Sequence, residues 1–223
     1  MRLFQRYCPI DPTPEDKAQT NFTDPEAKIM KQSNKGFDYS YNAQAVVDAE
    51  EQIIVAAEVT SAANDKQQAV PMAQAALDNL NAAGIERPKA ADGTPTPTPN
   101  TADTGYFSEK AVEGLEQVGM DPHLAIGRQK HHEVPAPTEA AVPSTDASVK
   151  EKMQQKLRSA TGKALYAARK HIVEPVFGQI KSARGIRKFL LRGLEKVSAE
   201  WQLICLTHNL LKIWRRSCSV GVD

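Results

Sequence analysis

Two short β-rich runs lie close together near residue 50. AQAVVD (43–48) and QIIVAAEVT (52–60) are separated only by Ala49, Glu50 and Glu51. Short runs of this kind joined by so few residues are typical of an antiparallel hairpin. The pattern therefore predicts two paired strands within residues 41–60.

Helical spacing follows the hairpin. Residues 69–80 place apolar side chains on one face, which predicts a helix capped by Asn64 or Asp65 and ending near Ala83. Pro71 either kinks this helix or marks its start.

Further elements are expected later in the chain. A short helix is expected from Ser108 to about Val118, then a buried strand in HLAIGR (123–128). Three more helical segments are predicted near 148–159, 163–182 and 193–216, the last with a core-facing apolar stripe.

Proline-rich stretches divide these elements. Residues 1–35 predict an extended lead-in, and residues 129–149, which are poor in large apolar side chains, predict a mobile insertion. The alternating Thr-Pro run of ADGTPTPTPNTADTGYF (91–107) favours an irregular connector that reaches Ala102 and Asp103. We therefore expect a main domain over 36–216 and a short tail over 217–223.

Composition limits the class of protein. With 223 residues and 41% hydrophobic content, the chain is able to close a core. It has no 18-residue apolar run and no secretory leader, so we expect a cytoplasmic protein without a membrane span. Three cysteines without CxxC spacing indicate neither a disulfide framework nor a zinc site.

The net charge of +1 conceals a division along the chain. Residues 150–216 hold 16 Lys and Arg against four acids, a balance of +12, and the remainder carries −11. Such asymmetry is expected where one end of a protein faces a polyanion. A solvated helical face rich in Lys and Arg explains it about equally well.

One acid stands out in the basic part. In YAARKHIVEPVFGQIK (166–181), Glu174 is the single carboxylate among several cations. Pro175 predicts that the helix kinks there or restarts. Taken alone, Glu174 is best explained as a cap or as a neutraliser of nearby Lys.

Longer motifs change that interpretation. Residues 166–216, together with NFTDPEAKIMKQSNKGFDYSYNAQAVVDAEEQIIVAAEVT (21–60), ADTGYFSE (102–109) and LAIGRQKHH (124–132), resemble DDE-type transposases of bacterial insertion sequences. The resemblance covers roughly residues 18–216, with several long motifs in the right order. It implies an α/β fold with a mixed sheet flanked by helices, like ribonuclease H. It also implies a nucleoid-associated enzyme of DNA transposition that works as a homodimer on transposon ends and target DNA.

The resemblance also implies site residues. Asp103 corresponds to the family's second aspartate, at the end of a strand, and Glu174 to its glutamate. Tyr166, Arg169 and Lys181 correspond to the family's tyrosine, arginine and lysine. The family often places its arginine four residues before the glutamate, where this chain has Lys170, so the choice between Arg169 and Lys170 stays open. The DNA-contacting set expected on this basis is Tyr166, Arg169, Lys170, Lys181, Arg184, Arg187 and Lys188.

The implied chemistry explains these residue types. In-line displacement at phosphorus is assisted by two Mg²⁺ ions, with Mn²⁺ as a substitute, and hard cations prefer carboxylate oxygen. Asp103 and Glu174 would supply it, while Arg and Lys neutralise flanking phosphates.

The family's first aspartate has no counterpart here. It lies on a strand upstream of the stretch that NFTDPEAK begins, and only 20 residues precede Asn21. We therefore expect a truncated C-terminal portion that does not catalyse alone. Asp48 and Asp65 are possible substitutes, although a hairpin-turn acid and a helix cap explain them better.

Other candidate groups have simpler explanations. His131, His132 and Glu133 fit a solvated loop better than a metal site. His208 and Trp201 fit a helix core better than a binding role. For Trp214, beside Arg215 and Arg216, stacking on nucleic-acid bases stays open as an alternative to core packing. Three functions stay open: a transposase, a catalytically inactive DNA-binding remnant, and a purely structural protein.

Overall fold

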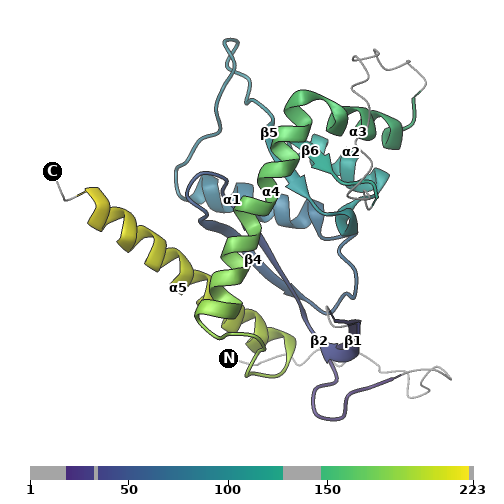
Figure 1. The fold of residues 1–223 in the computed structure, drawn as a ribbon, viewed down its shortest axis with the longest axis vertical. Coiled ribbons are helices and arrows are strands. Elements are labelled where there is room, and N and C mark those ends of the chain that lie inside the picture. Colours follow the sequence, from purple (N-terminus) through teal and green to yellow (C-terminus); the bar gives the residue numbers. More distant parts are fainter. Residues whose placement is uncertain (1–18, 33–34, 128–146, 221–223) are drawn as a thin grey trace, which may run out of the picture.

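The computed structural model describes residues 19–32, 35–127 and 147–220, which form a mixed α+β fold (Figure 1). Within these ranges six strands form three two-stranded sheets. The strands are β1 (Lys28–Lys31), β2 (Phe37–Ser40), β3 (Asn42–Val47), β4 (Ile54–Thr60), β5 (Thr98–Ala102) and β6 (Met120–Leu124). The helices are α1 (Ala69–Ala82), η1 (Thr104–Tyr106), α2 (Glu109–Gln117), α3 (Val149–Arg158), α4 (Ala160–Gly178), η2 (Gln179–Ala183) and α5 (Leu194–Val220).

The predicted hairpin is confirmed as β3 and β4. These strands pair antiparallel, with Asn42 opposite Thr60. Asp48 closes the turn, because its carboxylate accepts hydrogen bonds from the backbone N–H groups of Glu50 and Glu51 at 3.1 and 2.7 Å. The prediction that Asp48 is a turn acid is therefore confirmed.

The connector prediction for residues 91–107 was partly wrong, because Thr98–Ala102 forms β5. This strand pairs parallel with β6 through bonds from Thr98 N to Gly119 O and from Ala125 N to Ala102 O. In a parallel pair, alternate residues direct their N–H and C=O groups toward the neighbouring strand. That register turns the nitrogens of Pro99 and Pro122 away from the pair, so neither proline removes a ladder bond.

The first long helix begins later than predicted. Gln68 rather than Asn64 or Asp65 occupies the position before α1, and Pro71 lies in the first turn, where the missing N–H costs little. The shorter helix α2 agrees with its prediction, since the Ser108 side chain accepts from Ala111 N and caps it.

A tight corner joins α3 to α4. The Ser159 hydroxyl caps α4 by accepting from Gly162 N at 3.0 Å. A Cβ on Gly162 would lie 2.0 Å from the carbonyl oxygen of Lys156, so only glycine fits there. Of the two outcomes predicted at Pro175, a restart of the helix is wrong, because α4 runs through this residue as one helix.

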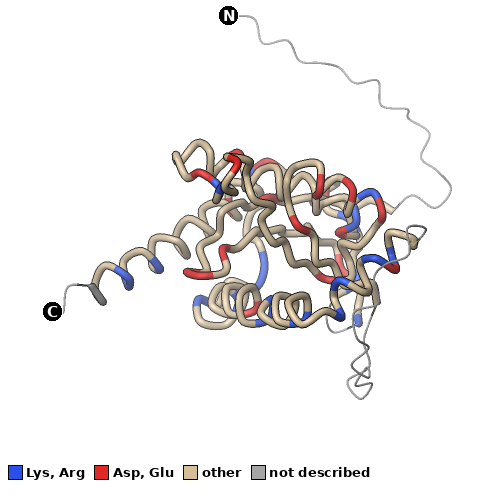
Figure 2. Tube along the Cα trace, turned by 90° about the horizontal axis from the view of Figure 1, so that it is seen from above, with Lys and Arg blue, Asp and Glu red and all other residues tan. Residues whose placement is uncertain are grey.

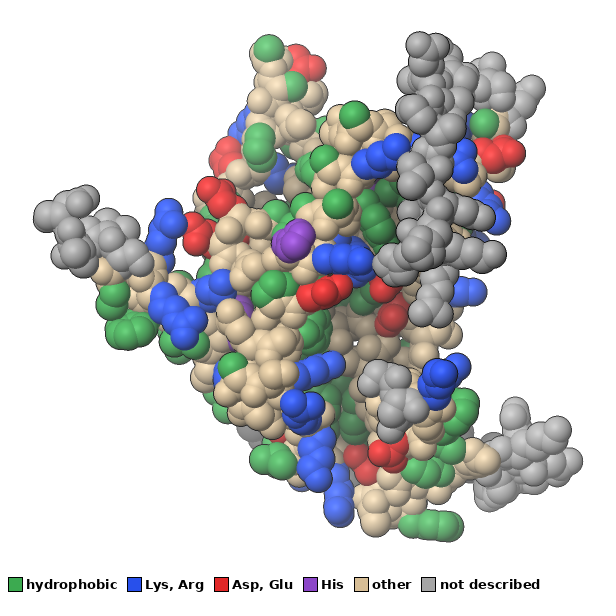
Figure 3. All heavy atoms as spheres, in the orientation of Figure 1, with side chains coloured by type: hydrophobic (Ala, Val, Ile, Leu, Met, Phe, Trp, Pro, Cys, Tyr) green, Lys and Arg blue, Asp and Glu red, His purple; other side chains and the backbone are tan. Residues whose placement is uncertain are grey.

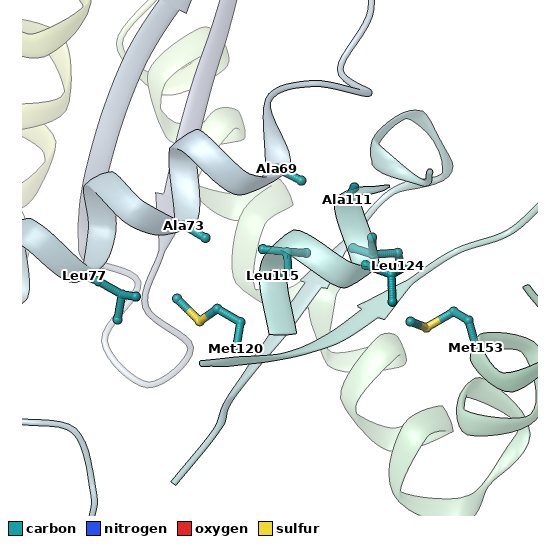
Figure 4. Packing of buried hydrophobic residues seen from close by; sticks show 9 residues of the cluster. Ala69, Ala73, Leu77, Ala111, Leu115, Met120, Leu124 and Met153 are labelled. Atoms are coloured by element: carbon teal, nitrogen blue, oxygen red, sulfur yellow. The ribbon is translucent and has the colours of Figure 1, made fainter. Parts of the chain in front are cut away.

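Two main apolar clusters hold these elements together. The first joins α1, α2, β6 and α3 through residues such as Ala73, Leu115 and Leu124. Figure 4 shows side chains from these elements directed toward one another. The second joins the β3–β4 hairpin to the end of α4 and to α5 around Trp201, whose ring stacks on Phe177 at 6.0 Å. The core prediction for Trp201 is confirmed.

The segment at residues 19–27 caps the start of α5. Asp24 accepts from Gly193 N, and Glu26 accepts from Leu194 N at 2.9 Å. Carboxylates are favourable at a helix N-terminus, where backbone N–H groups lack partners. The predicted insertion lies outside the described residues except for its last three positions, and the tail beyond 220 lies outside them too. No helix in the described ranges is long and apolar enough to cross a membrane.

Candidate functional site

Asp103 lies where β5 ends, as expected. Its backbone is extended, and its side chain accepts a hydrogen bond from Thr104 N at 2.7 Å, which starts the short helix η1. The carboxyl ends of parallel strands are common places for functional side chains. About 60% of the Asp103 side chain is exposed, so one carboxylate oxygen is open to a ligand.

Arg169 of α4 lies beside this carboxylate. Its Nη1 atom is 3.8 Å from Oδ2 of Asp103, and its guanidinium carbon lies 5.4 Å from the ring centre of Tyr166. Lys170 points to solvent as an exposed side chain. Of the two cations that the sequence left open, Arg169 is the one that contacts the aspartate.

A polar network supports the turn that carries Asp103. The Tyr106 hydroxyl donates to Oε1 of Gln44, a buried residue of β3. Gln44 Nε2 donates to Oδ1 of Asp65 at 2.8 Å, and Asn42 Nδ2 donates to the same oxygen at 2.6 Å. Burial, together with the negative charges of Asp65 and Asp103, raises the pKa of Tyr106 to about 12, so its hydroxyl stays protonated and able to donate.

Contrary to the sequence prediction, Asp65 does not cap α1 but accepts hydrogen bonds from Asn42 and Gln44 of β3. Its Oδ2 atom lies 3.1 Å from the position that a Cβ on Gly105 would occupy, so it sits directly against the Asp103 turn. The close approach also explains why glycine follows Thr104.

Glu174 is exposed on α4, one residue before Pro175. Because proline has no N–H, the carbonyl of His171 loses its usual helical partner. Gln52, from the β3–β4 turn, replaces it by donating from Nε2 to His171 O at 2.8 Å. This contact explains how α4 passes through Pro175 without breaking.

Gln52 also holds α5. Its Oε1 accepts from Lys212 Nζ at 2.7 Å, and its backbone oxygen lies 3.1 Å from His208 Nε2. Its φ of 58° is unusual for a residue other than glycine. The turn is thus fixed against the two helices that carry Glu174 and the basic C-terminal residues.

A basic hollow of about 680 Å³ lies between the β1–β2 hairpin and residues 177–192. Three of the predicted DNA-contacting residues, Lys181, Arg187 and Lys188, line it and are exposed. Lys31 and Arg192 add two cations that the sequence did not single out. Figure 3 shows a column of Lys and Arg side chains bordering this hollow, which reaches Asp65 at its other side.

Arg184 has a structural role. Its guanidinium donates to Ile204 O at 3.0 Å and to Thr207 Oγ1 at 2.5 Å, which ties the end of η2 to α5. It is therefore less available to a ligand than its exposed neighbours Arg187 and Lys188.

Carboxylates, histidines and cysteines are the side chains that commonly bind metal ions in proteins. In residues 19–32, 35–127 and 147–220, no three of these side chains come together in a way that could hold a metal ion. His131, His132 and Glu133 lie outside the described residues. Asp103 and Glu174 have carboxylate oxygens suited to a hard cation, and a complete donor set would require a further ligand.

Sequence reasoning missed Gln44 and Gln52. Neither lies in a motif with a recognised chemical role, and a lone glutamine gives no periodic signal. Pro175 was the one available clue, because a proline inside a helix leaves an acceptor that another group must satisfy.

Comparison with protein families matches residues 135–214 to the family described as Transposase DDE domain. The match includes Glu174, Arg169 and four cations of the hollow, Lys181, Arg187, Lys188 and Arg192. Asp103, Lys31 and the β3–β4 hairpin lie outside it. Searches among curated proteins and among solved structures each found no match. The family match confirms the resemblance of the C-terminal portion.

Proposed function

We propose, from the match of residues 135–214 to the family described as Transposase DDE domain, that the chain is part of a transposase catalytic domain that acts on DNA. In this proposal residues 36–216 belong to a ribonuclease H-like core. The protein associates with the bacterial nucleoid, and a second copy of the chain helps to hold two DNA ends.

The contact between Arg169 and Asp103 carries this proposal. These residues are far apart in the sequence, and Asp103 lies outside the matched family region. Their side chains nevertheless approach to 3.8 Å. An exposed carboxylate beside an arginine at the end of a strand is the arrangement expected for a site that holds a metal ion near a phosphate.

DNA contact is assigned to the exposed cations around the hollow. Lys181, Arg187 and Lys188 bind backbone phosphates, with Lys31 and Arg192 beside them. Lys170 extends this surface along α4, and Arg169 and Tyr166 serve the phosphate nearest Asp103. Arg184 acts indirectly, by holding η2 against α5.

Asp103 and Glu174 would hold Mg²⁺, with Mn²⁺ as a substitute. When bound, such ions activate the attacking oxygen and stabilise the leaving oxygen of a phosphodiester. The chain's own part is to orient the Asp103 carboxylate, through Thr104 N and the Tyr106–Gln44 bond beneath the turn.

The test of DNA contact is a gel-shift titration at rising salt concentration. We expect binding with little sequence preference, because phosphate contacts carry no sequence information. Log K should fall linearly with log salt, and Arg187→Ala with Lys188→Ala should reduce the slope by about two, roughly one for each lost phosphate contact.

Lys150→Ala with Lys152→Ala is the matched control, because these exposed lysines lie on α3 away from the residues that line the hollow. This pair should leave the slope nearly unchanged. A flat salt dependence in the wild-type protein would exclude DNA binding through phosphates.

A catalytically inactive DNA-binding protein is the second candidate. The specific observation in its favour is that the described residues bring together no three potential metal ligands. Misplacement of reacting groups by about 1 Å can cost on the order of a hundredfold in rate, so a missing ligand should cost more.

Nicking of supercoiled plasmid DNA with Mg²⁺ or Mn²⁺ distinguishes the two candidates. We expect no nicking by the purified chain alone. Metal-dependent nicking that disappears in both Asp103→Asn and Glu174→Gln would instead establish the transposase activity. Asp65, which lies against the Asp103 turn, would then be the first residue to test as a third ligand.

A further inference from the structure

Helix α5 has a second apolar face that no described residue covers. Five of its large apolar side chains are between 53% and 62% exposed. They are Leu203, Leu206, Leu210, Ile213 and Trp214, and we call them the outer stripe.

The outer stripe lies opposite the face that α5 packs on the hairpin. The buried side chains of the helix include Trp201, Ile204 and His208. Since successive residues turn by about 100° around a helix, the centres of the two sets are roughly half a turn apart. A helix that is apolar on both sides ordinarily has a partner on both sides.

The spacing of the stripe indicates what kind of partner fits. Leu203, Leu206, Leu210 and Ile213 alternate by three and four residues, the pattern of a coiled-coil seam. We propose that α5 pairs through this stripe with α5 of a second copy of the chain, in antiparallel orientation. The proposal deepens the pairing of two copies suggested above, and it requires no DNA.

Charge favours a second copy in this orientation. Gln202 and Thr207, which border the stripe, carry no charge that would repel an identical helix. Toward the N-terminal end of α5, the three-four spacing of the stripe continues to Ala199 and to Lys196, whose side chain is exposed. A parallel pair would place Lys196 beside its own copy, whereas an antiparallel pair sets the two lysines at opposite ends of the seam.

An antiparallel pair also aligns the stripe with itself. Leu206 of one chain then faces Leu210 of the other, and Leu203 faces Ile213. A pair that buried all of the exposed area of these five side chains would bury about 1,200 Å² in total, the lower end of the range for specific interfaces. Figures 1 and 2 show the C-terminal half of α5 projecting beyond the rest of the molecule, which leaves room for a second helix.

Light scattering after size exclusion, over a micromolar dilution series without DNA, tests the proposal. We expect the wild-type chain to have twice its mass of 24.4 kDa. Leu206→Glu with Leu210→Glu should weaken association by on the order of a hundredfold or more, because charges would enter an apolar seam. Leu190→Glu, at an 81% exposed leucine outside α5, is the control and should leave the dimer intact.

Cross-linking tests the orientation and does not depend on the folding of the charged variant. In a Cys8→Ser, Cys218→Ser background, a Leu206→Cys chain mixed with a Leu210→Cys chain should form a mixed disulfide. Each chain alone should form far less, because only facing positions bring the sulfur atoms close enough. A monomeric wild-type chain, a dimer that survives both glutamates in a folded protein, or cross-links between identical positions only would each overturn the proposal.

Discussion

Single side-chain amides make many of the connections around Asp103 and Glu174. Gln44 contacts Asp65 and Tyr106 through its side chain, and its backbone oxygen accepts from Trp201 Nε1 at 2.9 Å. An amide carries both donors and acceptors, so one residue can satisfy groups from different elements. Gln44 thereby links the Asp103 turn to the core around α5.

His208 is the residue whose protonation should affect stability. Its Nε2 atom must donate to the carbonyl of Gln52, since a carbonyl only accepts. Burial lowers the pKa of His208, the charges of Lys212 and Arg184 lower it further, and the bond to Gln52 partly opposes them.

The direction of the pH effect follows from this lowered pKa. Below about pH 6.5 the histidine binds a proton in the unfolded chain more readily than in the folded chain. The free energy of unfolding should therefore decrease as the pH is lowered. Urea unfolding between about pH 7 and pH 5 should show a steeper loss for the wild type than for His208→Gln, whose amide can still donate. Equal slopes would contradict the assignment.

Asp24 does not interfere with this measurement. Burial raises the pKa of Asp24, but hydrogen bonds, the one from Tyr41 first, lower it overall. Its contribution to stability is therefore lost only below about pH 4, outside the range of the experiment.

Helix α4 is the element that connects the two halves of the candidate site. Arg169, near its middle, contacts Asp103, while Val176, near its end, is fully buried in the cluster around Trp201. The helix passes from one contact to the other through Pro175, where Gln52 supplies the missing hydrogen bond. The geometry of the site therefore depends on this helix staying continuous.

A double-mutant cycle tests that dependence. Gln52→Ala should cost about 0.5–1.5 kcal/mol of stability, because it removes the exposed hydrogen bond to the His171 carbonyl. Pro175→Ala restores a backbone N–H that can bond this carbonyl. In the Pro175→Ala background, the cost of Gln52→Ala in urea unfolding should therefore fall by about 1 kcal/mol.

Pro71→Ala is the control for this cycle, since Pro71 lies in the first turn of α1 and has no contact with Gln52. The cost of Gln52→Ala should be unchanged in that background. An unchanged cost with Pro175→Ala would mean that Gln52 acts on stability only through Lys212 and the turn.

At the scale of the whole molecule, the described residues form two main apolar clusters and a smaller third one, in which Ala56 of β4 packs against Met72 and Ala76 of α1. Polar contacts also join the parts. The β3–β4 hairpin and the β5–β6 pair are separate sheets. The Tyr106–Gln44 bond, the Asp65 carboxylate and α4 connect them. Polar contacts of this kind help to fix a relative position, although the buried Nε atom of Arg169 has no hydrogen-bond partner among the described residues.

The basic and acidic parts of the sequence also occupy different places in the structure. Lysines and arginines from the basic C-terminal residues lie along α4 and toward the end of α5 (Figure 2). Others of this group line the hollow. Asp24 and Glu26, from the acidic part of the chain, are directed to the start of α5, where they cap backbone N–H groups. These two acids are thus engaged in capping α5, and the proposed function assigns the exposed cations of the hollow to DNA phosphates.

The sequence by itself determined the hairpin, the later helices and the core role of Trp201, because strand and helix periodicity, turn acids and serine caps act over a few residues. It also carried the resemblance of the C-terminal portion to transposase DDE domains, which the family match over residues 135–214 supports. Tertiary structure decided that residues 98–102 form a strand, that Arg169 rather than Lys170 contacts Asp103, and that Gln52 spans Pro175. Each of these depends on groups far apart in the sequence, and only packing of the whole chain determines which donor lies close enough to reach a given acceptor.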